Sequence, residues 1–417
     1  MNPKYHYQSN IDNNAPVWLI VSLILMNNFW SMAWLDLKVY QIFHLGVFML
    51  LFYFLYQERN RRAIPRGTHK YWIMALMLLP LLSVYSSNII YNRAVSDSLI
   101  VYRMHLGLLL YFVLWYKRVN MNQLKHVFLV LGLGYAFLTV IQQFTYPFAP
   151  FGMRTIGSGY LSSDIHHFER RLGFARYEIA GVYYAVIVGV LAVSRKIKIS
   201  TWVLIILFLS LVASGNRRVI GVSTIAIGLA WIFKNKSKNA FIHSVILVLA
   251  TLIVYNMRFL LFGDLANVGY DLEEGRGHSY EYFIELCLSN PLGTIFGFGL
   301  GRNSDVASAV TYTYLNNKRV ILSDTGAVAC WYYWGILYVI ALYGLFISLV
   351  LNKYLDKYFR GLAFAFLSFL WILFLSWEIA GSSFIAILAY ACDLNIYKNK
   401  KRFIKNHKSL LILDERF

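Results

Sequence analysis

The segment WVLIILFLSLV, Trp202–Val212, is apolar at odd and even positions alike. A strand of an outer-membrane barrel alternates apolar and polar residues, so this uniform run argues against a barrel and indicates a membrane-spanning helix. The whole chain agrees, because 59% of its 417 residues are hydrophobic and 14% are charged. A soluble protein carries about 25% charged residues. The sequence therefore predicts an all-α integral membrane protein.

Similar apolar runs recur along the chain and predict a single polytopic membrane domain, residues 1–417. The first run is too long for the core of a signal peptide and lacks a small-residue cleavage site, so we expect it to stay as a span. Three cysteines are too few for a disulfide framework. The twelve expected spans are 17–35, 38–57, 71–88, 98–116, 125–145, 177–194, 199–214, 218–233, 242–262, 326–351, 361–377 and 380–396.

Basic residues mark one side of the expected membrane. Of the 39 Lys and Arg residues, 25 lie in the N-terminal segment, in five alternate connections and in the tail 397–417. The positive-inside rule places these segments and both termini in the cytoplasm. The net charge of +19 is then a topology signal and gives no reason to expect nucleic acid. A single helix over 362–397 would put the basic tail outside, so we favour a hairpin that turns at Glu378–Gly381.

Two outward connections are long, residues 147–176 and 263–325. Connections of this length usually carry function or are disordered, and their mixed composition favours order. We expect short helices in the second loop, one of them Tyr280–Leu288.

The basic residues differ in kind between the two sides. Of the 14 that lie outside the inward segments, 12 are Arg and 2 are Lys. Arginine is preferred where a planar fork grips phosphate or carboxylate. Pairing with neighbouring acids explains any one of these arginines, whereas the set as a whole suggests a bound anion.

The strongest arginine motif is Ser214-Gly215-Asn216-Arg217-Arg218. It joins two apolar stretches of about 15 residues, roughly 22 Å of helix, which is shorter than the ~30 Å hydrocarbon core. We therefore expect the apex of this hairpin below the outer interface, where two arginines need a partner or a water-filled cavity. The alternative is that both side chains extend to the lipid headgroups.

The large outward loop holds a second cluster, Glu273-Glu274-Gly275-Arg276-Gly277-His278-Ser279, followed by Phe296-Gly297-Phe298-Gly299-Leu300-Gly301-Arg302. The glycines are only a weak indication of nucleotide binding, because no βαβ unit surrounds them. A tight turn whose N–H groups approach an anion is one alternative, and a flexible return to the membrane is another. Arg302 is a candidate anion contact.

Asp324 lies just before the tenth expected span, in Ser323-Asp324-Thr325-Gly326. It either caps that helix or acts as a general base at the outer face. The other long loop contains Arg154, His166, His167, Arg170, Arg171 and Arg176. Adjacent histidines in a polar loop are more often solvated than bound to metal, so no metal is expected. The arginines suggest a further anion contact.

The order of these motifs resembles the O-antigen polymerase and ligase superfamily over roughly residues 171–345. The features that carry the resemblance are Arg171-Leu172-Gly173, the Ser214–Arg218 motif, Arg276, Pro291-Leu292-Gly293, and the glycines at 297, 299 and 301. The ligase branch has a His-Asn pair before a later helix. This chain has Ser323-Asp324 there, followed by Trp334-Gly335-Ile336-Leu337, so the polymerase branch is favoured.

The resemblance implies a metal-independent and cofactor-independent glycosyltransferase of the bacterial inner membrane whose active site faces outward. Its substrate is an oligosaccharide repeat unit on undecaprenyl diphosphate, and the growing glycan moves to the non-reducing end of the incoming unit. A flippase and a chain-length regulator are possible partners. On this hypothesis Arg217, Arg218 and Arg276 hold the diphosphate, Asp324 or His278 activates the acceptor, and Arg170 and Arg171 contact the second carrier.

Two other activities stay open. A lipid-oligosaccharide flippase also has about twelve helices and a cationic interior, although transporters usually have shorter loops. An O-antigen ligase is the third alternative.

Overall fold

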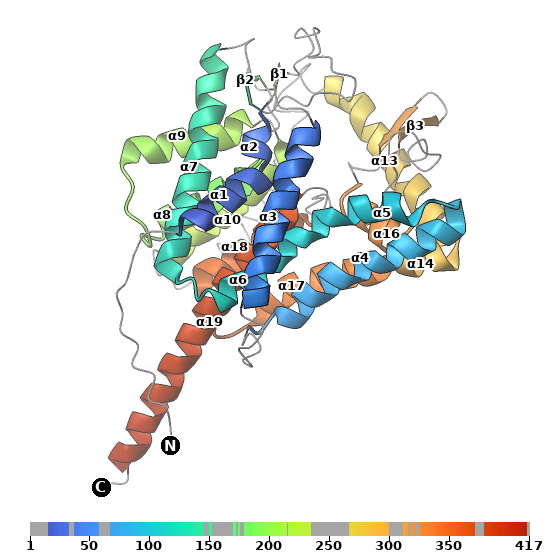
Figure 1. Ribbon diagram of the computed structural model, residues 1–417. Coiled ribbons are helices and arrows are strands. Elements are labelled where there is room, and N and C mark those ends of the chain that lie inside the picture. Colours follow the sequence, from blue (N-terminus) through green and yellow to red (C-terminus); the bar gives the residue numbers. More distant parts are fainter. Residues whose placement is uncertain are drawn as a thin grey trace.

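A computed structural model describes thirteen stretches of the chain: residues 16–32, 37–57, 67–145, 150–151, 170–171, 174–175, 179–214, 216–234, 267–299, 312–315, 318–321, 325–371 and 379–414. Helices make up most of these stretches (Figure 1). Two short antiparallel hairpins are added to them, β1 (Arg170–Arg171) with β2 (Phe174–Ala175), and β3 (Tyr312–Leu315) with β4 (Lys318–Ile321).

The helices follow the order of the expected spans. Their bounds are α1 (Val17–Met26), α2 (Asn28–Ser31), α3 (Leu37–Gln57), α4 (Lys70–Tyr91), α5 (Val95–Tyr102), the 3₁₀ segment η1 (Arg103–Leu108), α6 (Leu109–Tyr116), α7 (Met121–Thr145), α8 (Val182–Val193), α9 (Thr201–Ala213), α10 (Arg217–Lys234), α13 (Asn267–Leu288), α14 (Pro291–Phe296), α16 (Ala327–Trp334), α17 (Ile336–Leu351), α18 (Lys357–Phe369) and α19 (Ile379–Asp414).

Within the described stretches, five helices are long and apolar enough to cross a membrane: 38–57, 70–91, 95–116, 121–145 and 379–404. The helices α1, α8, α9 and α17 are apolar but shorter. The expected span 242–262 lies outside the described residues. The fold is therefore helical and of membrane type, as predicted, whereas the count of twelve spans and the orientation stay predictions.

The core is built around α8 and α19. Every residue of 184–191 in α8 and of 384–392 in α19 is buried, so these two segments are enclosed on all sides. Helix α8 packs between α7 and α10, and α19 packs on η1 and α6. A helix that is apolar all round belongs in such a position.

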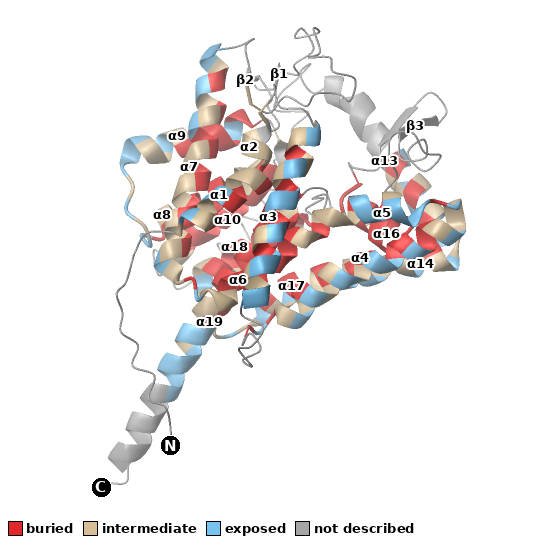
Figure 2. Cartoon of the chain, in the orientation of Figure 1, coloured by how far each residue is buried: buried red, intermediate tan, exposed pale blue. Residues whose placement is uncertain are grey.

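Large apolar side chains on the outer helices are exposed, and α3, α4 and α9 carry many of them (Figure 2). Trp202 on α9 is 76% exposed and Tyr71 on α4 is 70% exposed. An exposed apolar surface of this extent marks a protein or membrane contact. On a chain of this composition, lipid is the medium that it fits.

Two of the expected spans depart from a regular α-helix. Span 98–116 tightens into the 3₁₀ segment η1 between α5 and α6 without a break, and span 326–351 breaks at Gly335 between α16 and α17. His105 of η1 contacts Trp334 at this break, with ring centroids 4.5 Å apart. The 3₁₀ segment and the break therefore face each other inside the bundle.

Three boundaries differ from expectation. Span 17–35 is shorter, because α1 ends at Met26 and the next three described positions after Asn27 have positive φ. The cluster 273–279, expected in a loop, lies inside α13 despite its two glycines. The tail expected from 397 onward is continuous with α19 as far as Asp414, since its polar and basic residues include good helix formers.

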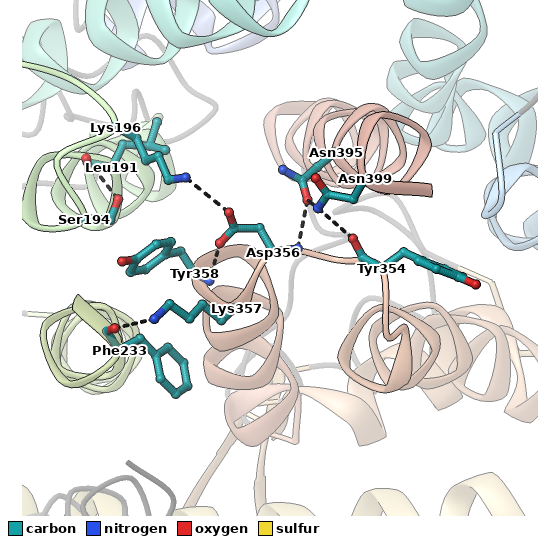
Figure 3. A network of polar contacts seen from close by, with 10 residues as sticks. All are labelled: Leu191, Ser194, Lys196, Phe233, Tyr354, Asp356, Lys357, Tyr358, Asn395 and Asn399. Atoms are coloured by element: carbon teal, nitrogen blue, oxygen red, sulfur yellow. Dashed lines mark hydrogen bonds and ion pairs between the residues drawn. The ribbon is translucent and has the colours of Figure 1, made fainter. Parts of the chain in front are cut away.

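Polar contacts tie together the connections that carry the basic residues (Figure 3). Asp356 caps α18 by accepting from the Tyr358 N–H at 3.0 Å, and its carboxylate lies 3.2 Å from Lys196 Nζ. Asn395 accepts from the Asp356 N–H at 2.8 Å, and Asn399 donates to the Tyr354 carbonyl at 2.8 Å. We call this part of the molecule the basic end. Residues 92–94, Ser214 and Asn216 lie at the opposite end of their helices.

A buried carboxylate also lies at the basic end. Asp393 of α19 is 1% exposed and accepts three hydrogen bonds. They come from His69 Nδ1 at 2.6 Å, from the His69 N–H at 3.1 Å and from the Tyr111 hydroxyl at 2.6 Å. Because a buried charge requires such partners, this group joins the start of α4 to α6 and α19.

Candidate functional site

Arg217 and Arg218 are the first two residues of α10, at the end opposite the basic one. Asn216 is the cap of this helix, since its side-chain oxygen accepts from the Arg218 N–H at 3.1 Å. The preceding Ser214 is buried and donates to the Leu211 carbonyl at 2.7 Å. The Asn216 N–H donates to the Ser214 hydroxyl at 3.3 Å, so these two described residues hold the ends of α9 and α10 close together.

The electrostatics of the first turn of α10 are unusual. A helix N-terminus carries about half a positive charge and favours acidic residues in the first turn. The first turn of α10 has two arginines and no acid. Each misplaced charge costs about 0.3–1 kcal/mol. A bound anion would turn this repulsion into an attraction, because it would interact with both arginines and with the helix end.

The two arms of the Ser214–Arg218 motif differ in length. Helix α9 has 13 residues, which is roughly 20 Å at 1.5 Å per residue and less than the ~30 Å hydrocarbon core. Helix α10 has 18 residues, roughly 27 Å, which is close to that thickness. The length of α9 fits the expectation that the motif lies below the outer interface, whereas the length of α10 does not require it.

Arg276 and His278 lie in α13, so they belong to a helix and not to the expected loop cluster. The His278 side chain is 44% exposed, and its Nδ1 lies 3.7 Å from a carboxylate oxygen of Glu281. Helix α13 packs on α16 and α14, and α10 packs on α18 and α8. The end of α18 lies near both α13 and α10, because the Tyr280 hydroxyl of α13 donates to the Trp371 carbonyl at 3.0 Å and the Phe369 ring lies against Gly221 of α10.

The other predicted site residues are located only in part. Arg170 and Arg171 form β1, and their backbone pairs with β2. Arg302 and Asp324 lie outside the described residues, as do Arg154, His166 and His167. Thr325, next to Asp324, is fully buried, and Gly326 caps α16 with a φ of +52°.

The glycine turn after α14 packs into the break at Gly335. Asn290 caps α14, and the Trp331 indole donates to the Thr294 carbonyl at 2.9 Å. The N–H groups of Phe298 and Gly299 donate to the carbonyls of Tyr332 and Tyr333 at 2.7 and 3.1 Å. These N–H groups are already used, so the proposed anion-binding turn is wrong for residues 297–299. The glycines instead permit close contact between two backbones.

Gly335 is the tightest point of this contact. Its φ is +84°, and a Cβ placed there would clash with the Ile295 carbonyl oxygen. The change Gly335→Ala is expected to destabilise the protein by ~2 kcal/mol or more, through overpacking and an unfavourable φ. Thermal unfolding in detergent measures this effect.

Gly46→Ala is the matched control. Gly46 lies on the exposed face of α3 with no atom near the position of a Cβ. Alanine there should raise the stability by about 0.5–1 kcal/mol, because glycine is the poorer helix former. Equal effects at Gly46 and Gly335 would contradict the close backbone packing at the break.

A further guanidinium lies beside this turn. Arg93 is 6% exposed in the connection between α4 and α5, and its guanidinium lies 5.9 Å from the centre of the Tyr91 ring. A Cβ on Gly299 would lie 3.3 Å from Arg93 Nη1. The Tyr91 hydroxyl lies 3.1 Å from that of Tyr332. The sequence shows that Arg93 is an arginine in a short connection expected to face outward. It does not show that Arg93 is buried against residues 297–299.

Two buried groups near the break lack polar partners. His105 is fully buried, and neither of its ring nitrogens has a hydrogen-bond partner among the described residues. The same holds for the Trp334 indole nitrogen. Cys287 in α13 is also buried, and burial raises the pKa of its thiol to about 12, so this thiol is no nucleophile near neutral pH.

Comparison with known proteins adds no relative: no family model matches the sequence, and no curated protein or solved structure does.

Proposed function

We propose that the chain is a polysaccharide repeat-unit polymerase that acts on lipid-linked oligosaccharides at the outer face of the bacterial inner membrane. The enzyme moves a growing glycan from undecaprenyl diphosphate to the non-reducing end of an incoming lipid-linked unit. The observation that supports this most is the first turn of α10, where Arg217 and Arg218 add their charge to a helix N-terminus. A diphosphate is an anion that such a turn can hold.

The reaction requires stabilisation of a leaving diphosphate. Charge develops on this group as the glycosidic bond to the carrier breaks, so fixed cations at that position lower the barrier. Asp324 or His278 would take the proton of the attacking hydroxyl. Arg276 and Arg302 would contact the diphosphate from the loop side, and Arg170 and Arg171 would contact the second carrier. Arg93, which lies beside the glycine turn after α14, is a further cation that could contact the diphosphate.

A flippase is the second candidate, and one observation favours it. The span that breaks at Gly335 faces the 3₁₀ segment η1 through Trp334 and His105, and discontinuous helices are typical of transporters. The ligase has less support, because the chain lacks the His-Asn pair of that branch.

The phenotype of cells that lack the protein separates these activities. Loss of a polymerase leaves single repeat units on the cell surface, and this is the expected result. Loss of a flippase leaves no repeat unit outside, and loss of a ligase leaves polymer on the carrier lipid. Either of these two results would contradict the proposal. Gel electrophoresis of surface extracts measures the glycan length and so distinguishes the three activities.

A further inference from the structure

A groove runs between α9 and α10, beside the Ser214–Arg218 motif. Phe208, Leu211 and Val212 of α9 line one wall, and Ile220, Ser223, Thr224 and Ile227 of α10 line the other. The groove has a volume of about 290 Å³. Along α10 its lining extends over seven residue steps, roughly 10 Å of helix.

The groove exists because the two arms of the hairpin diverge. Helix α9 packs mainly on α7, whereas α10 packs mainly on α18 and α8. Figure 1 shows α9 at the edge of the helix group, next to α7. Two consecutive helices whose ends are held close together would otherwise bury their facing apolar residues against each other.

The lining is apolar in effect, although it contains two hydroxyl groups. Ser223 and Thr224 both donate to the Ile220 carbonyl, at 2.9 and 2.8 Å. Neither hydroxyl therefore needs a partner from an occupant of the groove. An apolar chain can lie there without leaving a polar group unsatisfied.

The groove opens to the outside of the bundle. Phe208 is 36% exposed and Val212 is 39% exposed, and Thr224 is also exposed. This is the apolar surface of α9 that we expect to contact lipid. An occupant can therefore enter sideways from the bilayer without crossing the core of the protein.

Two arginine positions, 217 and 218, lie at the end of the groove where α10 begins. Arg217 precedes Ile220 by three residues and Thr224 by seven, and such spacings put positions on one face of a helix. Position 217 thus continues the row of groove positions to the start of α10. Arg218 is the next residue. A groove with apolar walls and a cationic end is complementary to an apolar chain with an anionic head.

We propose that this groove receives the isoprenoid chain of the carrier lipid next to its diphosphate, and that the chain enters laterally between α9 and α10. This inference rests on the proposed function and adds the place where the lipid is held. Two arginines and a helix N-terminus suit the two phosphates of a diphosphate better than the single phosphate of a phospholipid. The substrate lipid is therefore the occupant that the charge favours.

Photo-crosslinking tests this assignment. The full-length protein in nanodiscs is labelled with a synthetic polyprenyl diphosphate that carries a diazirine in the isoprenoid units nearest the diphosphate. Mass spectrometry is expected to find the label in residues 201–234. Val212→Trp fills the groove, so labelling should fall by about tenfold or more, because the chain loses its apolar contact area. Leu209→Trp is the matched control, since Leu209 is an exposed residue of α9 outside the groove.

The outcomes separate the groove from the function. If the wild type elongates chains but the label is found elsewhere, the groove is not the site of the isoprenoid chain, and the proposed function still stands. Equal labelling in Val212→Trp and Leu209→Trp would also contradict this role of the groove. Absence of both binding and elongation in the wild type would overturn the proposed function itself. A phospholipid with a photoreactive acyl chain completes the test: if it labels the groove and excess polyprenyl diphosphate does not displace it, the groove holds bulk lipid and the inference is wrong.

Discussion

Replacing Arg217 and Arg218 together by alanine is expected to lower the rate of polymer formation by about 10²–10³. This is the usual range when a group that stabilises developing charge is lost. Single changes to lysine should give intermediate rates, because lysine keeps the charge but lacks the planar fork. The measurement is polymer formed per minute by purified variants, with Arg402→Ala as the control. Arg402 lies exposed on α19 near the basic end and should have no effect.

The stability of the same variants separates a binding role from a structural one. Both arginines lie in the first turn of α10, where the helix dipole repels them. Removing each arginine relieves about 0.3–1 kcal/mol of this repulsion, and this gain offsets part of the stability lost with any contact that the side chain makes. A large loss of stability with an unchanged rate would assign the two residues to structure and remove them from the site.

Asp393→Ala is expected to have the largest effect on stability. The change leaves His69 and Tyr111 without the carboxylate that accepts their hydrogen bonds at 2.6 Å. Loss of one partner of a buried pair costs about 3–5 kcal/mol. Asp393→Asn should cost less, because the amide keeps the shape and an acceptor oxygen. The midpoint of thermal unfolding in detergent shows which of the two variants is the less stable.

Asp356→Ala is the matched control at the same end of the molecule. Its carboxylate is 21% exposed, pairs with Lys196 and caps α18. Loss of a helix cap costs about 1 kcal/mol, and an exposed ion pair adds little. If the loss of stability at Asp356 equalled that at Asp393, burial of the carboxylate would not be the cause of the larger effect.

The positions of most helices follow from the sequence because they depend on local apolar runs. The runs at 38–57 and 125–145 correspond to α3 and α7 with small shifts at their ends. The break at Gly335 does not follow from its surroundings, since a glycine in an apolar run is compatible with an unbroken helix. It depends on contact with residues 295–297, which are distant in the chain.

The candidate site was predictable in part for the same reason. The Ser214–Arg218 motif is local, and the sequence placed it between two helices as the structure does, although α10 is longer than expected, with 18 residues. The burial of Arg93 depends on the glycine turn some 200 residues later. The pairing of His69 with Asp393 joins residues 324 positions apart. A hydropathy pattern carries no information on such pairings, because it describes each segment alone.

Reconstitution tests the proposed activity most directly. The purified protein is given one substrate, a synthetic repeat unit on a polyprenyl diphosphate, and the products are separated by length. The proposal predicts a ladder of lipid-linked products that differ by one repeat unit, together with release of the free polyprenyl diphosphate. A substrate that stays a single unit, with protein that is folded and binds the lipid, would contradict it.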